Sequence, residues 1–168
     1  MMTKVGKFNA AVTQAVFAGV LVAGVSVFPD PAWPGECPAD QVLQEPRELE
    51  KAPDIGVQRP VLATVDLTGW REMGNFMLRL RRLTIAPGGV VPTHWHDDRP
   101  SIVYIVKGEL IEHNHKCAVP ILHREGEWTP ESGPNAHWWE NKSGVEAVVL
   151  STDVVPFKPQ KQDQMGDM

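Results

Sequence analysis

The sequence predicts an all-β domain, either a barrel or a sandwich, and three observations support this. Short runs rich in β-branched and apolar residues recur at near-regular spacing, with turn residues between them. The 168 residues include 14 glycines and 15 prolines, which suits short strands joined by turns better than long helices. No segment after residue 60 has a long helical period.

The expected strands follow one another along the second half of the chain. They cover residues 61–67, 75–85, 101–106, 109–114, 118–123, 127–130, 136–141 and 145–155. In 75–85 (NFMLRLRRLTI) both sides of the strand mix apolar and basic residues, so the pattern leaves open which side faces the core. The Pro-Gly-Gly at 87–89 predicts a turn.

The N-terminal part of the chain has a different character. In residues 1–28, Lys4 and Lys7 precede an uncharged apolar run, which is typical of a secretory signal, although an uncleaved anchor or a buried helix is the alternative. Residues 29–60 form a Pro-rich leader with one short helical turn expected near 43–51. The folded domain is expected over 61–156, followed by a flexible polar tail over 157–168.

Charge and cysteine content restrict the setting. The net charge of −5 argues against a nucleic-acid surface, and after export we expect no membrane association. A signal-like N-terminus predicts a periplasmic or secreted protein. In an oxidising compartment Cys37 and Cys117 could form a disulfide; the alternative is one buried thiol and one thiol in the leader.

Two histidines one residue apart, His94 and His96, are the first candidates for chemistry. On a strand, residues two apart point to the same face, so the two rings can converge while Trp95 faces away. Imidazole binds first-row divalent metals well. Taken alone, however, such a pair is more often simply two exposed strand residues.

The spacing around these histidines adds support. A first segment contains Gly88, His94, His96, Ser101 and Gly108, and a second runs from Gly126 through His137 to Asn141. This pattern resembles the two motifs of the cupin superfamily, Gly-(x5)-His-x-His-(x3–4)-Glu-(x6)-Gly and Gly…His-(x3)-Asn. The resemblance extends over about residues 73–154 and points to a small single-domain cupin. It implies a double-stranded β-helix, the cupin jelly-roll barrel.

In cupins the motif residues bind one divalent metal ion, and the resemblance transfers that role to His94, His96 and His137. The ion could be Fe, Mn, Ni, Cu or Zn. The sequence departs from the family at Ser101, which stands where the motif has Glu, and at Gly133-Pro134 in the loop before His137. Serine is a poor ligand, so we expect three neutral imidazoles that favour an anionic ligand. The alternative is a cupin that has lost its metal.

Other residues near the motifs have ordinary explanations. We expect His113, His115 and His123 to be surface or structural residues. The strand arginines Arg79, Arg81 and Arg82 are expected on a solvated face, although one of them could bind a carboxylate. By alternation Trp139 faces inward, as core or pocket wall, and Trp138 outward.

Two classes of function remain open. One is a metal-dependent enzyme acting on a small, anionic molecule: three-histidine cupin sites occur in thiol dioxygenases, and isomerase or lyase chemistry is the other option. The second is a non-catalytic ligand-binding or sensing cupin with a structural or absent metal. A storage role is less suited to a single domain. Because jelly-roll sheets have exposed edges, a homodimer is also expected.

Overall fold

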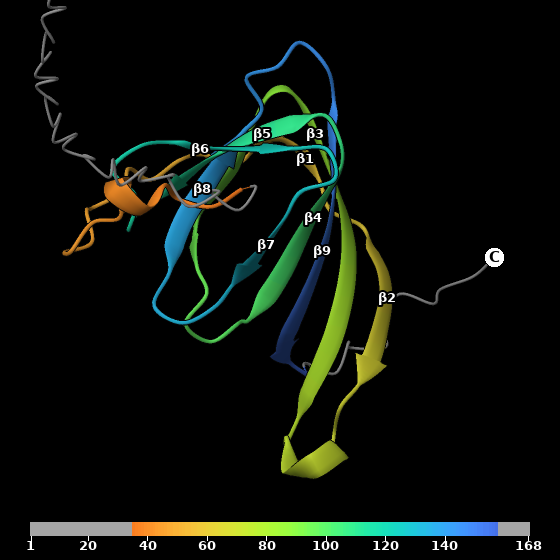
Figure 1. Cartoon of the computed structure of the whole chain (residues 1–168). Helices are drawn as coiled ribbons and strands as arrows, with labels where there is room; N and C mark the ends of the chain where they lie inside the picture. Colours follow the sequence, from red (N-terminus) through yellow and green to blue (C-terminus); the bar gives the residue numbers. More distant parts are fainter. Residues whose placement is uncertain (1–34, 158–168) are drawn as a thin grey trace, which may run out of the picture. The chain divides into compact units, whose positions relative to one another are not determined.

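The computed structural model describes residues 35–157, and all structural statements refer to these residues (Figure 1). Two short 3-10 helices, η1 (Ala39–Gln41) and η2 (Trp70–Glu72), accompany the strands. The strands are β1 (Ile55–Gln58), β2 (Val61–Asp66), β3 (Phe76–Trp95), β4 (Ser101–Lys107), β5 (Glu109–Asn114), β6 (Ile121–Arg124), β7 (Trp128–Glu131), β8 (Ala136–Glu140) and β9 (Ala147–Pro156).

All strand pairs are antiparallel, and the order through the sheet is β6-β5-β8-β3-β9-β4-β7, with β1 and β2 also paired to β3. The long strand β3 belongs to both halves of this arrangement. Its first part pairs with β9 over Phe76–Ile85, and its second part pairs with β8 over Val90–Trp95. The sheet therefore folds back on itself into a nearly closed jelly-roll barrel, which confirms the predicted all-β fold (Figure 1).

The Pro-Gly-Gly segment at 87–89 is a bend inside β3 and not the predicted strand-ending turn. Asn141 holds this bend: Gly88 N donates to Asn141 O at 2.8 Å, and Asn141 N donates to Gly89 O at 2.9 Å. Asn141 Nδ2 also donates to Ile85 O at 2.9 Å. A Cβ on Gly89 would lie 2.8 Å from Ala86 O, so only glycine fits here. The bend carries β3 from one half of the barrel to the other.

The barrel interior is filled from alternating strand positions. Its core consists of Leu83, Ile85, Val91, Val103, Ile105, Leu110, Trp139, Ala147 and Val149. This alternation settles which side of 75–85 faces in. Leu83 and Ile85 are buried, so the side that includes Arg79 and Arg81 faces the interior and Arg82 is exposed. The apolar interior thus gives way to a cationic region along one strand.

The sheet begins earlier than expected, with β1 inside the Pro-rich segment 29–60. The helical turn expected near 43–51 is wrong: that stretch has no helix, and η1 comes before it. A disulfide joins Cys37 to Cys117, with Val42 bridging to Cys117 beside it. The strand β1 was not predicted because the prolines of this segment interrupt the alternation of apolar and polar residues from which strands are predicted.

The signal-like segment 1–28 lies outside the described residues, as does nearly all of the expected tail over 157–168. Within the part of the chain that the structure describes, no helix has both the length and the hydropathy needed to cross a bilayer.

Candidate metal centre

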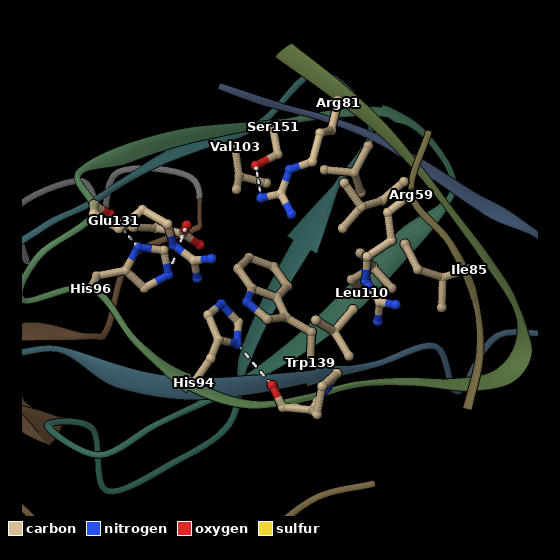
Figure 2. A pocket seen from close by; sticks show the side chains of 15 residues that line it. Arg59, Arg81, Ile85, His94, His96, Val103, Leu110, Glu131, Trp139 and Ser151 are labelled. Atoms are coloured by element: carbon tan, nitrogen blue, oxygen red, sulfur yellow. Dashed lines mark hydrogen bonds and ion pairs between the residues drawn. The ribbon is translucent and has the colours of Figure 1, made fainter. Parts of the chain in front are cut away.

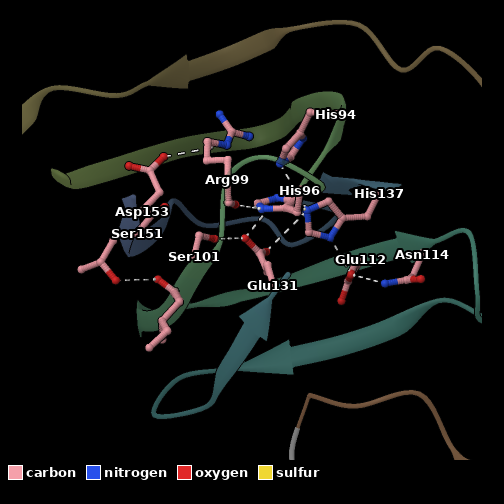
Figure 3. A network of polar contacts seen from close by, with 12 residues as sticks. His94, His96, Arg99, Ser101, Glu112, Asn114, Glu131, His137, Ser151 and Asp153 are labelled. Carbon is pink, nitrogen blue, oxygen red and sulfur yellow. Dashed lines mark hydrogen bonds and ion pairs between the residues drawn. The ribbon is translucent and has the colours of Figure 1, made fainter. Parts of the chain in front are cut away.

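The structure brings His94, His96 and His137 together at one end of the barrel (Figure 3). His94 lies near the end of β3 and pairs across the ladder with His137 on β8, while His96 follows β3 directly. His137 Nε2 lies 3.2 Å from His94 Nε2 and 3.0 Å from His96 Nε2. One nitrogen from each ring lies within 4.8 Å of the others.

Hydrogen bonds on the far side of each ring fix its tautomer. His94 Nδ1 donates to Pro92 O at 2.8 Å, and His96 Nδ1 donates to Arg99 O at 2.9 Å. His137 Nδ1 donates to Glu112 Oε1 at 2.6 Å. Because all three partners are acceptors, each neutral ring carries its proton on Nδ1 and a lone pair on Nε2. Three lone pairs therefore face one another, which is the arrangement that a cation would stabilise.

The protein environment also keeps two of the rings neutral. Burial, with the nearby His137, lowers the pKa of His94 to about 3. Burial likewise lowers the pKa of His96, although the charge of Glu131 works against this. At His137 burial also lowers the pKa, but the hydrogen bond to Glu112 and the charge of Glu131 outweigh it and raise the pKa. The negative potential that acts on His137 favours a positive charge at this point.

A carboxylate that the sequence analysis did not assign to the site lies beside the three histidines. Glu131, at the end of β7, is 4% exposed. Its Oε2 lies 3.3 Å from His96 Nε2 and its Oε1 lies 3.5 Å from His137 Nε2. Oε2 accepts a hydrogen bond from Ser101 Oγ, whereas Oε1 is buried and has no hydrogen-bond partner among the described residues. A set of three nitrogens and a free carboxylate oxygen fits a first-row divalent metal ion.

Glu112 on β5 is the second carboxylate that the sequence did not assign. It is 3% exposed and accepts hydrogen bonds from His137 Nδ1 at 2.6 Å, His123 Nε2 at 2.9 Å and Asn114 Nδ2 at 2.9 Å. Burial raises its pKa, but the hydrogen bonds from His123 and His137 outweigh this and lower it, so Glu112 is ionised. The sequence offered one sign of its burial: Glu112 lies two residues after the apolar Leu110 on a predicted strand, and residues two apart point to the same face.

The remaining histidines lie outside the three-histidine cluster. His123 and His115 are buried, at 0% and 5% exposure, so of the two expected explanations, surface or structural, the structural one fits them. His115 Nε2 donates to Pro134 O at 3.1 Å. His113 is partly buried and stacks on Trp138 at 3.8 Å between ring centroids. Trp138 is consequently covered although it faces away from the interior.

A cavity of about 180 Å³ opens beside the histidines (Figure 2). His94, His96 and Glu131 line one end. Its apolar wall is formed by Leu83, Ile85, Val91, Val103, Leu110, Trp139 and Val149. Trp139 thus serves both as core filler and as pocket wall. A cavity of about 150 Å³ can hold benzene, so this one suits a ligand of comparable size.

Arginines line the other part of the cavity wall. Arg59, Arg81 and Arg99 all contribute to the lining. Arg81 Nη2 donates to buried Asp153 at 3.0 Å, but the same carboxylate receives Arg79 at 2.9 and 2.7 Å and lies 3.9 Å from Arg99. One carboxylate therefore faces three guanidiniums. The Nε atoms of Arg81 and Arg99 are buried without a hydrogen-bond partner in the described chain.

The solved structures that resemble this chain do so only distantly. No protein-family model and no curated protein matches the chain. Similar solved structures include the cupin domain of Schizosaccharomyces pombe Cnp3 (10% identity, 62% of this chain and 67% of that one, TM-score 0.46). A Cupin_2 domain of an XRE-family transcriptional regulator from Enterobacter cloacae is 16% identical (62% and 99%, TM-score 0.44). Oxalate oxidase with the substrate analogue glycolate is 21% identical (TM-score 0.47), and the similarity covers 65% of this chain and 59% of that one.

Proposed function

We propose, from the premise that this chain is a cupin by its fold and its two histidine motifs, that it binds a divalent metal ion and a small organic anion side by side in its barrel. His94, His96 and His137 would hold the ion. A bound ion of this kind supplies Lewis-acid chemistry, or redox chemistry if it is iron, manganese or copper. The chain's own residues orient the rings, exclude water and bind the anion.

The observation that carries this proposal is the convergence of three Nε2 atoms: those of His94 and His96 lie 3.2 and 3.0 Å from that of His137. Each ring is held by an acceptor at its Nδ1, so none of the neutral rings can turn its proton inward without losing a buried hydrogen bond. Buried lone pairs at such distances repel one another unless a metal ion, or a proton on His137, lies between them. The imidazole set suits Fe, Mn, Ni, Cu or Zn.

The arginine-lined wall supports an anionic ligand. Burial lowers the pKa of Arg81, while Asp153 raises it, which means that the guanidinium is partly desolvated and gains from a further negative partner. The apolar walls and the volume of about 180 Å³ favour a small carboxylate with an apolar body. Its carboxylate would bind Arg81 or Arg99, and its other end would face the histidines.

Metal analysis of the purified protein tests the first part of the proposal, the bound metal ion. We expect close to one bound ion per chain for the wild type and its loss in His94→Ala. His113→Ala is the matched control, because His113 is a strand histidine outside the cluster. A wild type that binds none of the five metals after careful loading would refute the proposal. Thermal shifts of the loaded protein with glycolate, oxalate and benzoate then test the anion.

A non-catalytic binding or sensing cupin is the second candidate, and one observation favours it. Among the described residues that line the cavity, Glu131 is the one carboxylate, and it faces the histidines and not the rest of the cavity. No further acid or base is therefore in place for proton transfer to a ligand. Oxygen uptake and product analysis with each anion that binds would separate enzyme from binder, since a binder gives a thermal shift and no product.

Export and dimerisation stay predictions. The Cys37–Cys117 disulfide is consistent with an oxidising compartment, and the exposed Ile102, Tyr104 and Trp128 offer an apolar outer face for a second copy. Fractionation of expressing cells tests the first, and the molar mass in solution tests the second.

A further inference from the structure

Ser101 and Glu131 are directly opposite each other in the β4–β7 ladder, and both are buried. Ser101 stands at the motif position where cupins have the glutamate ligand. Side chains of directly opposite residues emerge on the same face with Cβ atoms about 5 Å apart. A carboxylate on β7 can therefore reach the region that a glutamate on β4 would have reached, once the β4 residue is small.

Ser101 also orients the carboxylate from β7. Its Oγ donates to Glu131 Oε2, which leaves Oε1 free of any hydrogen bond among the described residues (Figure 3). The two oxygens lie 3.3 Å from His96 Nε2 and 3.5 Å from His137 Nε2. These are the same nitrogens that converge with His94, so the carboxylate and the imidazoles border one space.

The arginines around the cavity do not compensate the negative charge of Glu131. The guanidiniums of Arg79, Arg81 and Arg99 face Asp153, and no ion pair joins any of them to Glu131 in the part of the chain described. The neutral His96 ring presents a lone pair to it. A buried carboxylate gains from a positive partner, so a cation in the space that Glu131, His96 and His137 border would be stabilised there.

We propose that Glu131 is the fourth protein ligand of the metal centre, so that the carboxylate missing from β4 is supplied from β7. This inference rests on the proposed metal site and changes its character: three imidazoles and one carboxylate leave a bound divalent ion with a net charge of +1 and not +2. Ser101 acts as a positioning residue that holds Oε2. The alternative is a structural ion pair between Glu131 and a protonated histidine.

Three variants test this. Glu131→Gln keeps the size and the contact to Ser101 but removes the charge. The exchange Ser101→Glu/Glu131→Ser moves the carboxylate to the opposite position on β4. Glu125→Gln, an exposed carboxylate before β7, is the matched control. Each protein is loaded with Co(II), and its affinity, its metal content and its visible absorption spectrum are measured.

We expect Glu131→Gln to weaken Co(II) affinity by more than tenfold. Tenfold is the low end of the loss typical when a residue that only orients a ligand is replaced. Its visible spectrum should change as one oxygen donor is lost. The exchange variant should recover most of the affinity, and Glu125→Gln should match the wild type. Wild-type affinity and an unchanged spectrum in Glu131→Gln would overturn the inference. A wild type without any Co(II) site would instead refute the proposed function.

The melting temperature of the metal-free protein separates a ligand from a structural ion pair. As a ligand, Glu131 is an uncompensated charge without metal, so metal-free Glu131→Gln should melt at or above the wild-type temperature. A structural ion pair predicts the reverse, with metal-free Glu131→Gln melting several degrees lower. That result, together with wild-type Co(II) affinity in Glu131→Gln, would contradict ligation by Glu131.

Discussion

Glu112 accepts a hydrogen bond of 2.6 Å from His137 Nδ1, and both residues are almost fully buried. The bond holds the ring so that its Nε2 points to His94 and His96. An ionised carboxylate behind a histidine also makes its Nε2 a stronger donor to a metal.

Removing this charge should weaken metal binding without removing a ligand. We expect Glu112→Gln to lower metal affinity by about 10- to 100-fold, because a neutral amide holds the ring less firmly and donates less charge to it. Competition titration with a metal-binding dye measures this. Glu109→Gln, three residues earlier on β5 and exposed, is the control. Equal affinities for Glu112→Gln and Glu109→Gln would show that the contact has no influence on the metal.

Metal removal should lower the stability of the barrel. The proposed metal would bind only the folded chain, which brings His94 and His137 together from β3 and β8, so loading at about 100 times the dissociation constant should add about 2.7 kcal/mol to the free energy of unfolding. For a domain of this size that corresponds to a rise in melting temperature of roughly 5–10 °C. Melting with chelator and after metal readdition measures it. His137→Ala should lose the difference; a persistent shift there would place the metal elsewhere.

Arg81 should matter for anion binding, and its neighbour Arg82 should not. Arg81 lines the cavity with its Nε unpaired, whereas Arg82 is exposed on the outer face. A hydrogen bond to a charged group contributes about 1.5–3 kcal/mol, so Arg81→Gln should weaken binding of a small carboxylate by about 10- to 100-fold. Calorimetric titration of the metal-loaded variants with the best anion of the panel measures this. Equal losses in Arg82→Gln would indicate a general charge effect.

Much of the fold could be predicted from local pattern. The strand expected over 109–114 is β5, and the strand expected over 136–141 is β8 to within one residue. The bend at 87–89 could not be predicted, because Pro-Gly-Gly is a turn signal unless another strand pairs with it. Here that pairing comes from Asn141, more than 50 positions further along the chain.

The candidate site also has residues that could be predicted from the sequence and one that could not. His94, His96 and His137 stand at motif spacings, so the sequence alone brings them forward as candidates. Glu131 has no spacing that marks it. Its proposed role depends on the ladder register opposite Ser101, because a shift of one residue would turn its side chain outward.

The Cys37–Cys117 disulfide joins cysteines 80 positions apart and attaches the segment before β1 to the turn after β5. In the chain-entropy model a loop of that length stabilises the folded state by about 4 kcal/mol. The double variant Cys37→Ser/Cys117→Ser should therefore unfold at clearly lower urea than the wild type. Reductant should lower the wild-type midpoint and leave the double variant, which has no cysteine, unchanged. Metal affinity should be preserved, because none of the three histidines belongs to the segment before β1 that the disulfide attaches. A wild type insensitive to reductant, or one in which both thiols react with a thiol reagent before reduction, would show that the bond is not formed.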